Sequence, residues 1–273
     1  MPRVAHTIAA LALALLAIQP SEAQETCFDG PVTPTHRIET TAPPSPGTVR
    51  PVIALAPLQP TATPAPVIVV LEGLILPAKG GEAARSTYSN VMADLRGKVV
   101  ALAAVDGPDR RGRLHGVLRL ESGASVGERL LAAGASLADV SFAPCATRFL
   151  AAETEARTEK RGIWRQSRIW TDLNAAAAGL PDFVLGRGRV ASVGRSGRTT
   201  YINFGGNYRT DATVRLREAT ASALTAAGRP PESLAGRMIE VRGWATRRNG
   251  LDLDLGTPLA LRLADSASDM GTD

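Results

Sequence analysis

The sequence predicts an α+β chain, built mainly of β-strands, that folds as two compact units. Short apolar runs such as Val67–Leu71 are bounded by turn residues and indicate buried strands. A few longer segments, of which Gly81–Leu95 is the clearest, repeat their apolar residues at helical spacing. Residues 171–182 fit neither pattern, and we interpret them as a linker between the two units.

The first 23 residues have the pattern of a cleavable signal peptide. A basic start containing Arg3 precedes an apolar run from Ile8 to Ile18, and a small-residue cleavage site ends at Ala23. This run, at ~1.5 Å per residue, is too short to cross the ~30 Å hydrocarbon core of a membrane as a helix. We therefore expect an exported protein, periplasmic or secreted, with no membrane anchor after signal cleavage.

The two cysteines, Cys27 and Cys145, are expected to form a disulfide in such an oxidising compartment. The alternative is two free thiols whose geometry forbids a bond. Two cysteines and three histidines do not make a convincing zinc site, and no metal site is predicted. The sequence also lacks a P-loop, a dinucleotide-binding fingerprint and a serine-hydrolase elbow.

The first unit is predicted to cover residues 67–170. Residues 24–66, which precede it, are rich in proline and threonine and indicate a loop-rich entry segment with one short strand around Val49–Leu55. After Val67–Leu71 the predicted elements are the helix Gly81–Leu95, the strands Lys98–Val105 and Arg113–Leu120, the helix Val126–Ala133, the extended segment Ala135–Val140 and the helix Thr147–Arg161. Gly134 and Gly162 follow the two later helices at typical C-terminal capping positions.

The second unit is predicted to cover residues 183–264. Its expected strands are Gly188–Ser192, Thr199–Phe204, Thr213–Leu216, Met238–Ala245 and Leu251–Leu255, with the helix Glu218–Ala227 among them. Five strands with one interposed helix are the elements of an OB-type barrel. Residues 265–273 form a polar tail that we expect to be disordered.

Three motifs of the first unit occur in a distinctive order. Asp109–Leu114 contains Asp-x-x-Gly-Arg, Ser125–Ala135 forms a helix that ends in glycine, and Ala156–Trp164 ends in Gly-Ile-Trp. With these motifs, Val69–Trp164 resembles the staphylococcal nuclease (thermonuclease) family, whose domain is an OB-barrel with packed helices. The resemblance implies a nuclease-like OB-barrel followed by a second, OB-like barrel.

The resemblance also implies where catalytic groups should lie, and most of them are replaced here. The catalytic strand of the family reads Arg-Leu-x-Gly-Ile-Asp-x-Pro-Glu, which matches the run Val70–Ala78. Val70 replaces an arginine that binds phosphate, Ile75 replaces an aspartate that binds calcium, and Ala78 replaces the proposed general base. Arg113 is the only retained family position, because the upstream Asp-Gly-Asp-Thr element is missing as well.

A replacement active site would need other acidic residues. We expect Glu72 to face away from the groove and Asp109 to lie on a loop, whereas His115 follows Arg113 closely enough to approach a ligand there. No cofactor is expected, and calcium would be needed only if nuclease activity is retained.

The second unit is strongly basic, although the whole chain has a formal net charge of only +5. Between residues 183 and 250 there are twelve arginines and four acidic residues. Arginines combined with aromatic side chains can bind single-stranded nucleic acid through backbone charge and base stacking. The candidate residues are Arg189, Arg198, Tyr201, Arg209 and Trp244. The alternative is that arginine is the ordinary surface cation of a chain with three lysines, and that the aromatic residues belong to the core.

Three functional hypotheses follow. The first is an exported family member with a degenerate active site, a pseudoenzyme that serves as a non-catalytic binding or scaffold module for an unknown protein or polyanion. The second is a secreted metal-dependent nuclease with a repositioned site, which requires at least two carboxylates near Arg113. The third is a protein that binds single-stranded nucleic acid through the second unit.

Overall fold

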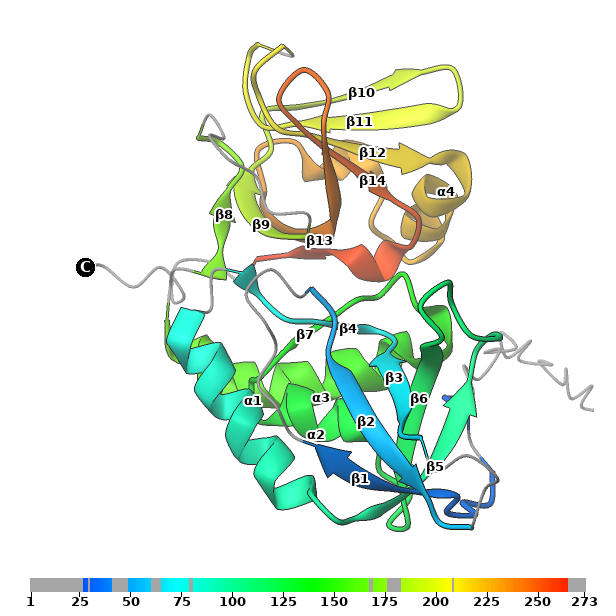
Figure 1. The fold of residues 1–273 in the computed structure, drawn as a ribbon. Helices are drawn as coiled ribbons and strands as arrows, with labels where there is room; N and C mark the ends of the chain where they lie inside the picture. Colours follow the sequence, from blue (N-terminus) through cyan, green and yellow to red (C-terminus); the bar gives the residue numbers. More distant parts are fainter. Residues whose placement is uncertain are drawn as a thin grey trace, which may run out of the picture.

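The structure is a computed structural model that describes residues 27–28, 30–40, 49–59, 65–78, 81–166, 169–175, 183–207 and 209–264. The predicted signal peptide (residues 1–23), much of the predicted linker and the predicted tail (residues 265–273) lie outside the described residues. Figure 1 shows two β-rich units, one above the other. The predicted α+β class, made mainly of strands, is confirmed. None of the helices within the described ranges is long and apolar enough to cross a membrane.

The first unit is a closed barrel of five strands in the order β1-β2-β3-β6-β5. The strands are β1 (His36–Thr40), β2 (Val52–Pro57), β3 (Val67–Leu71), β5 (Val99–Ala104) and β6 (Leu114–Leu120). β3 and β6 run parallel to each other, whereas the other neighbours are antiparallel. The barrel encloses an apolar core that includes Ile38, Leu55 and Leu118.

Two strands of this barrel come from the segment that we expected to be a loop-rich entry. β1 was not predicted at all, and β2 begins three residues after the start of the predicted strand. The prediction gave too much weight to proline, because Pro51 and Pro57 lie at the ends of β2 rather than inside its ladder. Ile38 and Ile53 from these strands are each 1% exposed, so the segment is part of the core.

Three helices pack on this barrel, namely α1 (Gly81–Leu95), α2 (Val126–Ala132) and α3 (Ala146–Thr158) (Figure 1). α2 and α3 end where Gly134 and Gly162 meet, and both glycines have positive φ. A Cβ atom on Gly134 would lie 2.3 Å from the carbonyl oxygen of Arg161, and one on Gly162 would lie 2.2 Å from that of Gly134. The glycine of the Gly-Ile-Trp motif is therefore required by a close approach of two backbones.

The predicted disulfide between Cys27 and Cys145 is confirmed. Both cysteines are buried, and Cys145 lies immediately before α3. Arg119 on β6 also donates hydrogen bonds to the backbone carbonyls of Phe28 and Gly30. The disulfide and these bonds attach the start of the described chain to the barrel.

The second unit is a sheet with the strand order β10-β11-β12-β14-β13-β9-β8, which curls round on itself (Figure 1), and we call it the second barrel. Its strands are β9 (Phe183–Arg189), β10 (Ser192–Ser196), β11 (Thr199–Asn203), β12 (Thr213–Arg217), β13 (Met238–Arg247) and β14 (Leu251–Leu255), with β8 (Thr171–Asp172) and β15 (Leu261–Leu263) added at its side. Only two residues separate β9 from β10, so the two ends of the sheet are successive pieces of one chain segment. The predicted strand Gly188–Ser192 was wrong in its bounds, because it spans this break.

Both barrels follow the same path. In each, a helix connects the first three strands to the last two, and the third strand pairs in parallel with the fifth. The helix is α1 in the first barrel and α4 (Glu218–Ala226) in the second. The predicted OB-like character of both units agrees with this arrangement.

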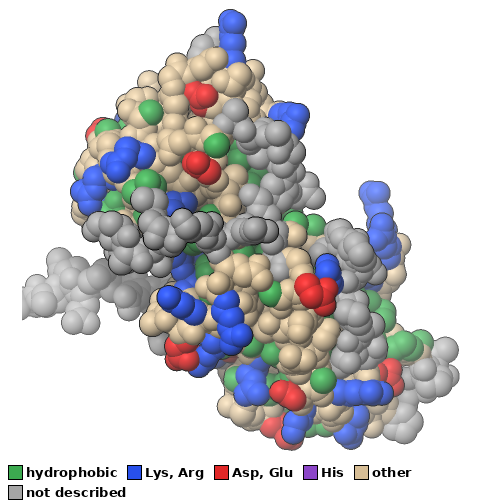
Figure 2. Space-filling view, turned by 90° about the vertical axis from the view of Figure 1, so that its left-hand side faces the viewer, with side chains coloured by type: hydrophobic (Ala, Val, Ile, Leu, Met, Phe, Trp, Pro, Cys, Tyr) green, Lys and Arg blue, Asp and Glu red, His purple; other side chains and the backbone are tan. Residues whose placement is uncertain are grey.

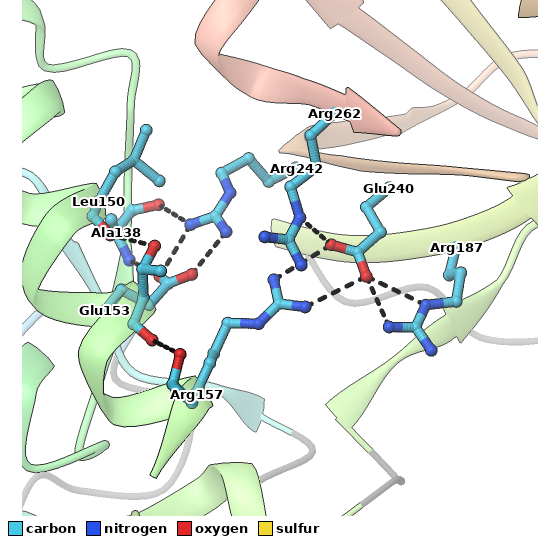
Figure 3. A network of polar contacts seen from close by, with 10 residues as sticks. Ala138, Leu150, Glu153, Arg157, Arg187, Glu240, Arg242 and Arg262 are labelled. Carbon is cyan, nitrogen blue, oxygen red and sulfur yellow. Dashed lines mark hydrogen bonds and ion pairs between the residues drawn. The ribbon is translucent and has the colours of Figure 1, made fainter. Parts of the chain in front are cut away.

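The two units share an interface with an ionic part and an apolar part. Figure 3 shows Arg242 of β13 paired with Glu153 of α3, and Glu240 bound by several arginines. The apolar part joins the short strands β4 (Leu74–Ile75) and β7 (Leu137–Ala138) to β9. There, Ile75 and Leu137 belong to one buried cluster with Phe183 and Leu185.

The ion pairs of Glu240 lead to a pH-dependent prediction. Burial raises the pKa of Glu240, but hydrogen bonds from Arg262, Arg157 and Arg187 outweigh it and lower the pKa to about 2. Since this pKa lies below the ordinary value of 4.5, the contribution of Glu240 to stability is present above that value and is lost as the pH falls towards 2. The difference in melting temperature between the protein and Glu240→Gln should therefore shrink as the pH falls from about 6 to about 3. Melts followed by circular dichroism test this, and a constant difference would contradict it.

Candidate functional site

Arg113, which the resemblance marks as a retained family position, lies at the end of a turn between β5 and β6. One oxygen of Asp109 accepts hydrogen bonds from the backbone N–H groups of Arg111 and Arg113, at 2.8 and 3.0 Å. Its other oxygen accepts from the Arg113 side chain, at 2.9 Å from Nε and 2.7 Å from Nη2. Hydrogen bonds from Arg113, first through its side chain and then through its backbone, hold the pKa of the Asp109 carboxyl well below its usual range. The charge of Arg113 is therefore balanced inside its own motif.

His115 lies between two carboxylates beside this turn. Its Nδ1 is 2.6 Å from Glu72 Oε1, and its Nε2 is 3.4 Å from Asp109 Oδ2. Our expectation that Glu72 faces away from the groove was wrong. β3 pairs Val70 with His115, and Glu72 lies two residues after Val70 and so returns to the same side.

Further bonds extend this cluster to the second barrel. Arg50 donates to Glu72 at 2.7 Å and to Asp139 at 2.9 Å. Asp139, whose side chain is 1% exposed, also accepts from Ser141 and, at 3.2 Å, from Nε1 of Trp244. We call the residues Arg113, Asp109, His115, Glu72, Arg50 and Asp139 the polar chain.

The polar chain carries no excess of positive charge. Its two arginines face three carboxylates, so it has a formal charge of −1 with neutral His115 and of zero with protonated His115. A phosphate group would therefore compete with carboxylates that already occupy both guanidinium groups. The polar chain therefore serves as a link between the first barrel and Trp244, and it is not suited to binding an anion.

The three positions that the resemblance marks as substituted do not supply replacement chemistry. Val70 on β3 and Ile75 on β4 are buried, with 3% and 1% exposure, and Ala78 is exposed. None of these side chains has an oxygen that could bind calcium. In the described part of the chain, no three His, Cys, Asp or Glu side chains are grouped so that they could hold a metal ion. The residues present do not fit the calcium that the resemblance implies.

The candidate nucleic-acid residues of the second barrel come from different elements, and two of its candidate arginines bind other groups of the chain. Arg189 on β9 donates to the backbone of Gly236, and Arg198 in the β10–β11 turn pairs with Glu218. Arg209 lies in the connection between β11 and β12. Figure 2 shows acidic side chains among the basic ones on the face that it presents.

Trp244, a candidate for base stacking, contacts several groups of the protein itself. Its ring packs edge-on against Phe183, and the Arg50 guanidinium lies 5.5 Å from its centroid. Together with the bond to Asp139, these contacts place Trp244 at the junction of the two barrels. It is 38% exposed, so only part of the ring contacts solvent.

Tyr201 lies on the outer face of β11, and the charged side chains beside it form ion pairs. Its neighbours in register are Gly194 on β10 and Arg215 on β12. Arg215 pairs with Asp252 at 2.7 Å, and Arg217 pairs with Asp254 at 3.2 Å. The two arginines of this face therefore meet two aspartates from β14, which lies between β12 and β13.

Sequence reasoning missed Arg50 and Asp139, and it misplaced Glu72. Arg50 lies in the segment expected to be loop-rich, and Asp139 in a short extended piece, so neither carried a motif. The position of Glu72 was available from the alternation of side chains along a strand, because residues 70 and 72 share a face.

The comparison with known families agrees with this geometry. Residues 78–166 match a family described as Staphylococcal nuclease homologue. The match begins at Ala78, the last of the three substituted positions, and ends after the Gly-Ile-Trp motif. No curated protein matches the chain.

Proposed function

The domain that contains residues 78–166 belongs to the staphylococcal nuclease family, and from this premise we propose that the protein acts by binding a partner and does not hydrolyse phosphodiester bonds. One observation carries the proposal. Ile75, at the position of the family's calcium-binding aspartate, is 1% exposed and lies in an apolar cluster with Phe183 and Leu185 of the second barrel. The second barrel thus covers the place where the family binds its metal.

Hydrolysis of a phosphodiester requires groups that these positions no longer provide. Water must lose a proton to a base, a hard cation needs carboxylate ligands, and the developing negative charge needs positive groups. A positioned base alone contributes roughly 10²- to 10⁴-fold to the rate. Loss of a charge donor in the site costs roughly another 10²-fold. Arg113 is a positive group, but it is already paired with Asp109, and it supplies neither a base nor a ligand for a cation.

The polar chain is the strongest argument for the rival hypothesis, a nuclease with a rebuilt site. Glu72 and Asp109 do converge on His115 next to Arg113, as that hypothesis requires. However, Glu72 is also bound to Arg50, and Asp109 is bound to Arg113 through both its oxygens. Hydrogen bonds from Arg113 hold the pKa of Asp109 well below its usual range and make it a poor base, and the oxygens of Glu72 already bind Arg50 and His115. We therefore favour a binding role.

We further propose that the mature protein works outside the cytoplasm, in the periplasm or in the medium. The signal-peptide pattern of residues 1–23 supports this location. The Cys27–Cys145 disulfide supports it as well, because such bonds persist in oxidising compartments. The partner is a protein or a polyanion, and the balanced outer face of β11 and β12 argues against single-stranded nucleic acid.

A nuclease assay tests the proposal. The purified mature chain is incubated with single- and double-stranded DNA and RNA, with calcium, with magnesium and with a chelator, beside an active family member. We expect no cleavage above the chelator control, and no difference between the protein and the variants Arg113→Ala and His115→Ala. Metal-dependent cleavage that either substitution abolishes would establish a rebuilt nuclease. Salt-dependent retention of uncut single strands would instead support the nucleic-acid-binding hypothesis.

A further inference from the structure

β10 is the outermost strand of the second barrel. It stands first in the strand order, and β11 is its only neighbouring strand in the described part of the chain. Figure 1 shows β10 on the side of the second barrel that faces away from the first barrel. Gly197, with a φ of 57°, and Arg198 form the tight turn that joins β10 to β11. Within β10 only Val193 is partly buried and the other residues are exposed, so this edge of the sheet is accessible.

The backbone of β10 has one open side. The N–H group of Ala191 donates to the carbonyl of Asn203 at 2.8 Å, so the backbone groups of Asn203 point towards β10. Ser192 pairs with Asn203 in register, and its own backbone groups therefore point back towards β11. Since these groups alternate along a strand, the N–H and carbonyl groups of Val193 and Arg195 point away from β11. No group among the described residues binds them on that side, so they can pair with a further strand.

Basic side chains outnumber acidic ones at the end of β10. Arg195 and Arg198 share a single carboxylate, that of Glu218, at 3.5 and 2.8 Å. The two arginine side chains are 62% and 88% exposed, and neither forms another ion pair within the described ranges. An acidic side chain on a strand added beside β10 would therefore find a cationic partner here.

An open space lies over the middle of β10. Gly194 pairs in register with Tyr201, so both residues belong to the outer face of the sheet. A Cβ atom on Gly194 would have no other atom within 4 Å, which means that the Tyr201 ring does not cover this glycine. Aromatic side chains on a neighbouring strand can cover such glycines. The residue opposite Gly194 in an added strand is therefore expected to be large and apolar.

We propose that β10 binds an extended segment of a partner protein as an additional antiparallel strand, with an apolar residue opposite Gly194 and an acidic residue opposite Arg195. Backbone hydrogen bonds supply the affinity of such strand addition, and the side chains supply its sequence preference. This rests on the proposed binding role and gives it a surface. A second copy of the chain fits this edge less well, because its own β10 has no acidic residue and would leave both glycines uncovered.

Fluorescence anisotropy of a fluorescein-labelled peptide with the full mature chain tests the proposal. The peptide Glu-Thr-Glu-Phe-Val-Thr places its phenylalanine opposite Gly194 and its second glutamate opposite Arg195 when it runs antiparallel to β10. We expect a dissociation constant below about 1 mM. Replacement of both glutamates by lysine should weaken binding by about tenfold or more, because like charges then face each other.

Methylation of single peptide nitrogens distinguishes strand addition from attraction by charge alone. The N–H group of the peptide valine faces Val193 and bonds to β10, whereas the N–H group of the phenylalanine points away from β10. N-methylation of the valine should therefore weaken binding by about tenfold or more, and N-methylation of the phenylalanine should weaken it by less than about threefold. Both peptides are measured on the parent protein, so the comparison does not depend on the folding of a variant.

A pair of variants places the binding at β10. Val193→Pro removes the N–H group that faces the open edge, a position where an edge strand tolerates proline, and should weaken binding by about tenfold or more. Its matched control, Val193→Ala, keeps that N–H group and should bind the peptide like the parent protein. Circular dichroism checks that both variants are folded.

No binding of the peptide, or equal binding of the two N-methylated peptides, would overturn the proposal. A dimer in solution that Val193→Pro dissociates would also overturn it, because the edge would then pair with a second copy of the chain. Failure of the peptide test without nuclease activity would move the binding role to another surface, whereas nuclease activity would remove the binding role itself.

Discussion

Replacing both cysteines in Cys27→Ser/Cys145→Ser is expected to lower the free energy of unfolding by about 4 to 5 kcal/mol. The disulfide joins residues 118 positions apart, and the entropy that a cross-link removes from the unfolded chain grows with the length of the closed loop. It also holds the segment around Phe28 at the start of α3, so its loss releases contacts of the native state. Urea unfolding followed by circular dichroism measures the difference.

A reducing agent provides the matched control for this prediction. It should destabilise the parent protein by a similar amount and leave the serine double variant unchanged. A decrease below about 1 kcal/mol in the double variant would mean that the folded barrel holds its N-terminal segment without the covalent link.

Breaking the buried ion pair between the barrels should have an effect of similar size. Arg242 and Glu153 have side chains that are 7% and 1% exposed, and Glu153 also accepts a hydrogen bond from the backbone of Ala138. Arg242→Met should lower the free energy of unfolding by about 3 to 5 kcal/mol, because it leaves the Glu153 carboxylate buried without its cation. Unfolding in urea should be followed by both tryptophan fluorescence and circular dichroism, because two domains can unfold in separate steps.

The double variant Arg242→Met/Glu153→Met separates this cause from a general loss of packing. Replacement of both partners by apolar side chains removes the unpaired charge, so the double variant should be more stable than Arg242→Met alone. A surface control, Arg198→Met, should change stability by less than about 1 kcal/mol. If the double variant is no more stable than the single one, the unpaired charge is not the cause of the loss.

Much of the first domain could be predicted from sequence because its elements carry strong local signals. The period of α1, the capping residues of α2 and the glycines after α2 and α3 all appear as patterns within a few residues. β1 was missed because its partners are β2 and β5. Whether this segment forms a strand depends on closure of the barrel and not on its own composition. The prolines of this segment suggested a loop, but Pro51 and Pro57 lie at the two ends of β2, where a strand tolerates them.

The candidate site was less predictable, since it depends on contacts between distant segments. Arg113 and Asp109 belong to one short motif, and their side chains form an ion pair. The rest of the polar chain brings together Arg50, Glu72 and Asp139, and 89 residues separate the first of these from the last. Likewise, the arginines of the second barrel could be counted from sequence, but not divided between the outer face and the interface. Trp244 illustrates this limit, because composition alone cannot distinguish a stacking surface from a contact between domains.

The ion pair between Glu153 and Arg242 cannot form until the ribosome has added Arg242, which follows Glu153 by 89 positions. Synthesis proceeds from the N-terminus at roughly 5 to 20 residues per second, so the 89 residues between the two partners take about 4 to 18 s to add. During this time the first barrel already contains Glu153, Ile75 and Leu137 but lacks the strands that bury them. A nascent chain therefore exposes a carboxylate beside an apolar patch, a surface on which a chaperone can act before the second barrel arrives.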